Sequence, residues 1–174
     1  DWNRMPISFS LLGSEDNETW VNIKQFFLGN NYWGSAQQSK TWDVENETAY
    51  KYYKLVVIQT QQATYVRIGE LGLCSYPSFK RIYWFEDEYI VPIMNSDSQD
   101  GYVASASSYY APANHYPCHA FNRNNNSTWL TDFNDIAGAW LKIQLPEAIT
   151  VSYFSIQTSN EPNQLGRLPK TFKI

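Results

Sequence analysis

The sequence predicts an all-β fold, an antiparallel β-sandwich, and three observations lead to this prediction. Patterns typical of helices are nearly absent from the 174 residues. Short runs rich in β-branched and aromatic residues alternate with clusters of Asn, Gly, Ser and Asp, as is typical of strands joined by turns. Aromatic residues make up 17% of the chain, enough to fill a large core in a chain of about one domain's length.

The first half of the chain contains four predicted strands. They are expected near residues 6–12, 19–27, 50–60 and 64–73. Asp16 and Asn17 form a turn signal between the first two. Residues 50–59 (YKYYKLVVIQ) begin with alternating apolar side chains and continue as Leu-Val-Val-Ile, as expected of a central strand. Residues 30–35 read as a loop.

The second half of the chain contains five more predicted strands. They are expected near residues 101–107, 116–122, 139–145, 150–158 and 170–174. In the third of these, Trp140, Lys142 and Gln144 alternate with Leu141, Ile143 and Leu145, which predicts one face in water and one in the core.

Residues 75–90 (SYPSFKRIYWFEDEYI) differ from both halves in charge and aromatic density. We interpret this stretch as a connector, the alternative being an ordinary edge strand or loop. Residues 122–127 read as a loop.

A short segment occurs twice. Residues 4–11 (RMPISFSL) reappear as residues 167–174 (RLPKTFKI), with Arg, Pro and Phe at matching places. If the match is not chance, one strand of one fold is present in two copies. The chain is then either a piece of a tandem array or one permuted domain that carries a spare strand.

Composition excludes several classes of partner. The net charge is −4 and there is no basic run, which disfavours nucleic-acid binding. No apolar stretch approaches the length of a membrane span.

Two cysteines, Cys74 and Cys118, do not make a disulfide framework, and they are either buried thiols or one bridge.

Motifs in both halves resemble one known family. The similar segments are residues 13–20 (GSEDNETW), 50–55 (YKYYKL), 65–73 (YVRIGELGL), 101–108 (GYVASASS), 120–129 (AFNRNNNSTW), 139–145 (AWLKIQL), 151–157 (VSYFSIQ) and 166–174 (GRLPKTFKI). They resemble, in circular order, the discoidin or coagulation factor V/VIII type C domain, which is galactose-binding-like. The resemblance implies an antiparallel jelly-roll sandwich.

The order of the motifs also suggests an organisation for the chain. Residues 1–74 resemble the C-terminal half of such a domain and residues 91–174 the N-terminal half, with 75–90 between them. The two halves either pack together as one domain or need partners from neighbouring repeats or copies of the chain.

Catalysis is not indicated. The two histidines, His115 and His119, lie among prolines in a segment that is not helical, and no hydrolase or metalloprotease motif occurs. The carboxylates at Asp132 and Asp135 read as solvated side chains. We therefore expect a non-enzymatic protein.

The resemblance implies a structural calcium ion. In the family, an Asp, an Asn and a Thr of one loop and a Glu of the last strand hold it, and the matching residues here are Asn122, Asn124, Ser127 and Glu70. Asn122 replaces the Asp of the family, and Arg123 replaces a Gly, so negative charge is lost and positive charge is gained. The alternative is an Asn-capped loop without metal.

The resemblance also places ligand binding in loops at one end of the sandwich, where aromatic and amide side chains suit sugars. The candidate residues are Tyr32, Trp33, Trp42, Tyr109, Tyr110, Asn114, His115 and Phe133. We expect Tyr32 and Trp33 to be exposed, and Trp20, Trp129 and Trp140 to lie in the core. The loops lack a basic rim, so membrane lipid is the weaker expectation.

Three functions remain open. The first is a module that binds cell-surface or extracellular glycans in adhesion or host attachment, in a virion fibre or a surface protein. The second is a structural repeat or homo-oligomer assembled by strand exchange. The third is an accessory module of a glycoside-active enzyme. Asn-x-Ser/Thr sequons such as that at Asn17 agree with an extracellular, cell-surface or virion location.

Overall fold

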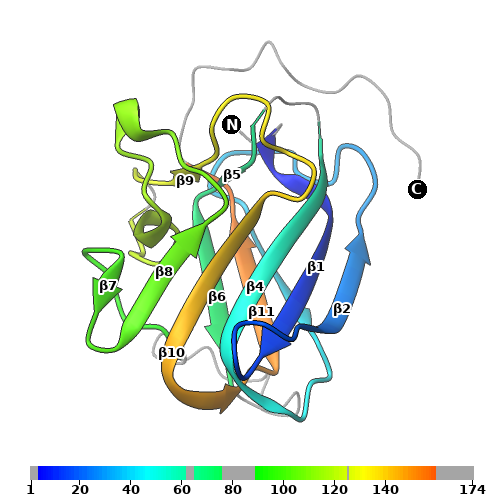
Figure 1. Ribbon diagram of the computed structural model, residues 1–174. Helices are drawn as coiled ribbons and strands as arrows, with labels where there is room; N and C mark the ends of the chain where they lie inside the picture. Colours follow the sequence, from blue (N-terminus) through cyan, green and yellow to red (C-terminus); the bar gives the residue numbers. More distant parts are fainter. Residues whose placement is uncertain (1–3, 62–64, 76–88, 125, 160–174) are drawn as a thin grey trace.

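The computed structural model (Figure 1) describes residues 4–61, 65–75, 89–124 and 126–159, and it confirms the predicted all-β sandwich. The strands are β1 (Pro6–Ser14), β2 (Val21–Phe27), β3 (Ser39–Asp43), β4 (Ala49–Thr60), β5 (Arg67–Ile68), β6 (Glu70–Cys74), β7 (Ser98–Gln99), β8 (Tyr102–Ala106), β9 (Trp129–Leu130), β10 (Trp140–Thr150) and β11 (Tyr153–Gln157). Two short 3₁₀ helices are η3 (Ala111–Ala113) and η4 (Pro117–Ala120).

The strands form antiparallel sheets that draw on both halves of the sequence. The six-stranded sheet has the order β2-β1-β4-β10-β8-β7, the three-stranded sheet β3-β11-β6, and β5 pairs with β9. The β4–β10 pairing joins residues before 75 to residues after 90, with Leu141 opposite Leu55. In the smaller sheet, β11 lies between β3 and β6.

The core lies between the two larger sheets, where the inward faces meet. Leu141, Ile143 and Leu145 of β10 are buried as their alternation predicted. From β4, the Tyr53 hydroxyl donates to the Ile149 carbonyl at 2.6 Å and accepts the Val151 N–H at 3.1 Å, which fixes the turn between β10 and β11. Burial raises the pKa of Tyr53 to about 12.

Trp33 is buried, so the expectation that it is exposed was wrong. Its side chain is 1% exposed, and its indole N–H donates to the Pro6 carbonyl at 2.8 Å. Trp42 does not lie in a loop as expected but in β3, half-buried, where it stacks on Phe154 with ring centroids 5.0 Å apart. Tyr32 is half-buried at 6.4 Å from the Trp42 ring. These aromatic rings, with Phe9 and Phe26, form an inter-sheet cluster.

Of the three tryptophans expected in the core, only Trp129 is fully buried. Trp140 is half-buried, on the same outward face of β10 as Lys142. Trp20 is half-buried over the outer face of the sheet, with the Lys54 ammonium 3.6 Å from its ring centroid. Strand parity, which had placed Trp140 beside Lys142, was the better guide than residue type.

Other elements differ from expectation for local reasons. The predicted strand at 116–122 is wrong, because Pro117 has no N–H to donate and opens η4 instead. The predicted strand at 64–73 divides into β5 and β6 at Gly69, whose N–H donates to the Gln157 carbonyl at 2.8 Å. A strand, β3, lies where only loop was expected.

The turn expected at Asp16 and Asn17 is present. An oxygen of the Asp16 carboxylate accepts the N–H groups of Glu18 and Thr19, and these bonds lower the pKa of Asp16 to about 2.

Three sequence predictions concern residues outside the described part of the chain. The second copy of the repeated segment, the strand near 170–174 and most of the connector at 75–90 belong there. Within the described residues, Cys74 pairs with Tyr89 in an isolated β-bridge, and Cys74 and Cys118 are not joined by a disulfide. No helix in these residues has the length and hydropathy needed to cross a membrane.

Candidate functional site

Five of the predicted ligand-binding residues lie in the loops at the upper end of the sandwich in Figure 1, near β5 and β9. Short β5–β9 pairing, with Arg67 opposite Leu130, brings the segment that begins at Tyr65 beside the segment after Trp129. The Thr131 N–H donates to the Val66 carbonyl at 3.1 Å, which continues this pairing.

Four rings from three loops meet there and form what we name the loop-end cluster: Tyr65, Tyr110, His115 and Phe133. The Tyr65 ring centroid is 5.5 Å from that of Phe133 and 6.5 Å from that of Tyr110. The Tyr110 and His115 rings are 6.4 Å apart. Phe133 is 63% exposed, so this cluster offers an aromatic face to solvent.

Hydrogen bonds within the loops hold the cluster in place. The Tyr110 N–H donates to the Leu130 carbonyl at 2.8 Å, and a His115 ring nitrogen lies 3.0 Å from the Thr128 carbonyl. The Ser108 hydroxyl accepts the Asp132 N–H and bonds to the Asp135 carboxylate. The loop that carries Phe133 is therefore fixed at both of its ends.

The structure separates the predicted binding residues into two groups. Tyr110, His115 and Phe133 belong to the loop-end cluster, while Tyr109 is 39% exposed and packs on Tyr116 at 5.2 Å beside it. Asn114 is exposed and ends η3 in a left-handed conformation, with φ of 56°. Tyr32, Trp33 and Trp42 pack instead in and against the inter-sheet cluster described above.

Two members of this region were missed from the sequence. Tyr65 was read only as the start of a strand, and Arg4 as part of the repeated segment. The Arg4 guanidinium lies 4.9 Å from the centroid of the Tyr65 ring, and Arg4 is buried. The polar neighbours of Tyr65 (QQATY) were the available signal that it sits at a loop.

The four residues proposed to hold calcium are close together in space. The Asn124 N–H donates to the Glu70 carboxylate at 2.9 Å and to the Asn122 side-chain oxygen at 3.0 Å. The Asn122 amide donates to the Ser127 hydroxyl at 2.7 Å. Burial raises the pKa of Glu70 to about 7, although N–H groups of Arg123 and Asn124 and the Arg123 charge oppose the shift.

These contacts fit a hydrogen-bonded loop better than a calcium site. Calcium prefers several oxygen ligands with negative charge, whereas Glu70 is the one carboxylate here and it already accepts a backbone N–H. Arg123 adds positive charge. Among the residues that the structure describes, no group of three or more His, Cys, Asp or Glu side chains is placed to hold a metal ion. Calcium binding stays a prediction.

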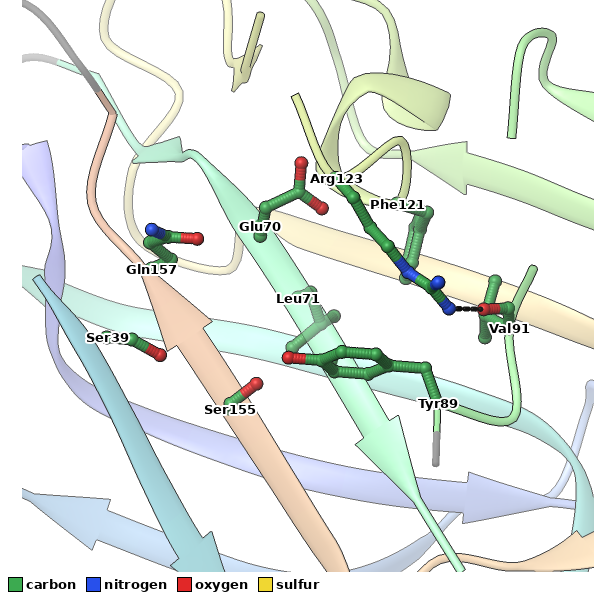
Figure 2. Close-up of a pocket in the computed structure, with 10 residues that line it drawn as sticks. Ser39, Glu70, Leu71, Tyr89, Val91, Phe121, Arg123, Ser155 and Gln157 are labelled. Atoms are coloured by element: carbon green, nitrogen blue, oxygen red, sulfur yellow. Dashed lines mark hydrogen bonds between the residues drawn. The ribbon is translucent and has the colours of Figure 1, made fainter. Parts of the chain in front are cut away.

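A cavity of about 250 Å³ opens beside this loop, on the outer face of the three-stranded sheet (Figure 2). It is lined by Ser39, Glu70, Leu71, Gly72, Tyr89, Val91, Phe121, Arg123, Ser155 and Gln157. We name it the sheet-face pocket. Only Glu70 among these residues was singled out from the sequence as a binding residue.

Comparison with family models, with curated proteins and with solved structures found no match to this chain.

Proposed function

We propose that the chain is a non-catalytic module that binds extracellular or cell-surface glycans at the loop-end cluster. The observation that carries the proposal is the meeting of Tyr65, Tyr110 and Phe133 from three separate loops, with Phe133 63% exposed. The C–H face of a sugar ring packs on an aromatic ring, and its hydroxyls bond to nearby polar groups.

Polar side chains stand beside the aromatic face. Asn114, Asp132 and Asn134 are exposed in the same loops, and the imidazole of His115 is a member of the loop-end cluster. The order of the sequence motifs adds support for a discoidin-like jelly roll with its binding loops at this end. An extracellular, cell-surface or virion location follows from this proposal.

A glycan array probed with the purified chain tests the function. We expect saturable binding to a defined glycan, and we expect Phe133→Ala to weaken it about tenfold, the loss of roughly 1.4 kcal/mol of stacking. Phe133 is exposed, so its replacement should leave the fold intact. Affinities are measured by calorimetry on the best array ligand.

Phe27→Ala is the matched control, since Phe27 is also exposed, at 74%, but lies on β2, which β1, β4 and β10 separate from β8 in the six-stranded sheet. Equal affinities of Phe133→Ala and the unchanged chain for every glycan bound would refute binding at the loop-end cluster. Repeating the array with EDTA asks separately whether calcium is needed.

A structural role is the second candidate, and one observation favours it. Strand β2 is an edge of the six-stranded sheet and exposes Val21 at 48% and Phe27 at 74%. Such an edge can accept a strand from another copy of the chain. Sedimentation velocity distinguishes the two: a single monomeric species over a wide concentration range would remove this candidate.

A further inference from the structure

The sheet-face pocket originates in the register of the three-stranded sheet. Gln157 of β11 lies opposite Ser39 of β3 on one side and opposite Glu70 of β6 on the other, so three polar side chains form one row. In the next row on the same face, Ser155 lies opposite Gly72. The alternate residues of β11, Phe154 and Ile156, point into the core.

Gly72 leaves room for one wall of the cavity because it has no side chain. A Cβ atom at this position would lie 2.1 Å from a ring carbon of Tyr89 and 2.4 Å from the Ser155 hydroxyl oxygen. The Tyr89 ring therefore lies directly against β6 and forms one wall, as Figure 2 shows. The Arg123 guanidinium packs on this ring at 4.9 Å and donates to the Val91 carbonyl at 3.3 Å, which holds the wall in place.

Several polar side chains that line the cavity are available to bond to a ligand. The side chains of Ser39, Gln157, Ser155 and Tyr89 make no hydrogen bond to any residue in the described part of the chain. Glu70 uses one oxygen to accept the Asn124 N–H.

We propose that the sheet-face pocket is a second binding site, which accepts one neutral, polyhydroxylated ring such as a terminal sugar unit. An apolar ligand would leave the four unpaired polar groups without water or a partner, which is unfavourable. An anion would meet Glu70 and a cation would meet Arg123, so neither charge is favoured. Drug-sized ligands occupy cavities of roughly 300–1,000 Å³, and this smaller cavity suits a single ring.

This site shares no residue with the loop-end cluster and does not depend on glycan binding there. It also differs from the calcium prediction, because Glu70 acts here as a hydrogen-bonding group toward a neutral ligand. A chain with both sites would engage two sugar units of one branched or multivalent glycan, which raises its apparent affinity.

The test is a titration of the ¹⁵N-labelled chain with each of a panel of neutral methyl hexosides, followed through the amide NMR shifts. The sugar concentration rises to about 10 mM, a range suited to single-ring ligands. We expect saturable shifts at Gly72, Ser155 and Gln157 for at least one sugar. Gln157→Ala should weaken that binding at least fivefold, while Phe133→Ala should leave it unchanged. Ser155→Leu, which fills the cavity, should abolish it.

Gln25→Ala, at an exposed Gln on β2, is the matched control for Gln157→Ala, and thermal melts verify that every variant is folded. Shifts confined to the loop-end residues, or no shift with any sugar of the panel, would overturn the second site and leave the proposed function intact. Shifts at the pocket without any at the loop end would support the second site and count against the loop-end proposal.

Discussion

Replacing Trp33 by alanine is expected to lower the free energy of unfolding by about 3–5 kcal/mol, the cost of emptying a filled core position. The indole is 1% exposed and lies in T-shaped contact with Trp42 at 6.1 Å. Its N–H donates to the Pro6 carbonyl at 2.8 Å, and the Trp33 backbone is bonded to the Gln61 side chain through both its N–H and its carbonyl. Urea unfolding measures the loss.

Two further variants separate the contribution of the indole hydrogen bond from that of aromatic packing to the stability of the fold. Trp33→Phe keeps an aromatic ring but leaves the Pro6 carbonyl without its donor, which costs about 1–3 kcal/mol. Tyr32→Ala, at the half-buried neighbour, is the control and should cost less than Trp33→Ala. A loss below 1 kcal/mol for Trp33→Ala would mean that the side chain is exposed, as the polar loop composition had suggested.

The second large effect is on the pH dependence of stability, through Glu70. Its pKa in the folded chain is about 7, above the ordinary value of 4.5, and burial is the main cause. Folding therefore favours the protonated form. The contribution of Glu70 to stability is full below pH 4.5 and is lost as the pH rises through about 7. The shift corresponds to about 3 kcal/mol.

Glu70→Gln removes this ionisation and retains an oxygen that accepts the Asn124 N–H. The variant should be more stable than the unchanged chain by about 3 kcal/mol at pH 8 and equal to it below pH 4.5, as measured by urea unfolding across the pH range. Asp16→Asn is a control of opposite sign, because hydrogen bonds lower the pKa of Asp16 to about 2 and its contribution is lost only in acid.

Parallel pH profiles of Glu70→Gln and the unchanged chain would contradict the prediction. Added calcium provides a further comparison at pH 8. If the ion binds through Glu70, it stabilises the unchanged chain and has less effect on Glu70→Gln. Equal effects on both would remove Glu70 from any calcium site.

Strand periodicity predicted the parts of the fold that depend on neighbouring residues alone. The alternation across β10 correctly placed Leu141, Ile143 and Leu145 in the core. It failed at Pro117, where the missing N–H of proline rules out a strand, and in segments whose apolar residues show no periodic spacing. Trp33 lies in such a segment, and its burial depends on Gln61 and Pro6, which are distant in the sequence.

The candidate sites were only partly predictable for a related reason. Loop composition indicated Tyr110, His115 and Phe133, which the structure brings together with Tyr65. The sheet-face pocket gave no signal, because Ser39, Ser155 and Gln157 are ordinary strand residues taken singly. These three residues come together because of the register between β3, β11 and β6. The residue pattern of a single strand does not reveal that register.

The pairing of β4 with β10, and the place of β11 between β3 and β6, have a consequence for how the chain acquires its structure. During synthesis, β1 to β6 leave the ribosome before the strands that complete their sheets exist. Their apolar faces therefore remain exposed to water until the strands that cover them, which come later in the sequence, have been synthesised. Pairing between strands that are distant in the sequence slows folding and leaves aggregation-prone hydrophobic surface exposed in the intermediates. We therefore expect the yield of folded chain to rise at low temperature or in the presence of chaperones.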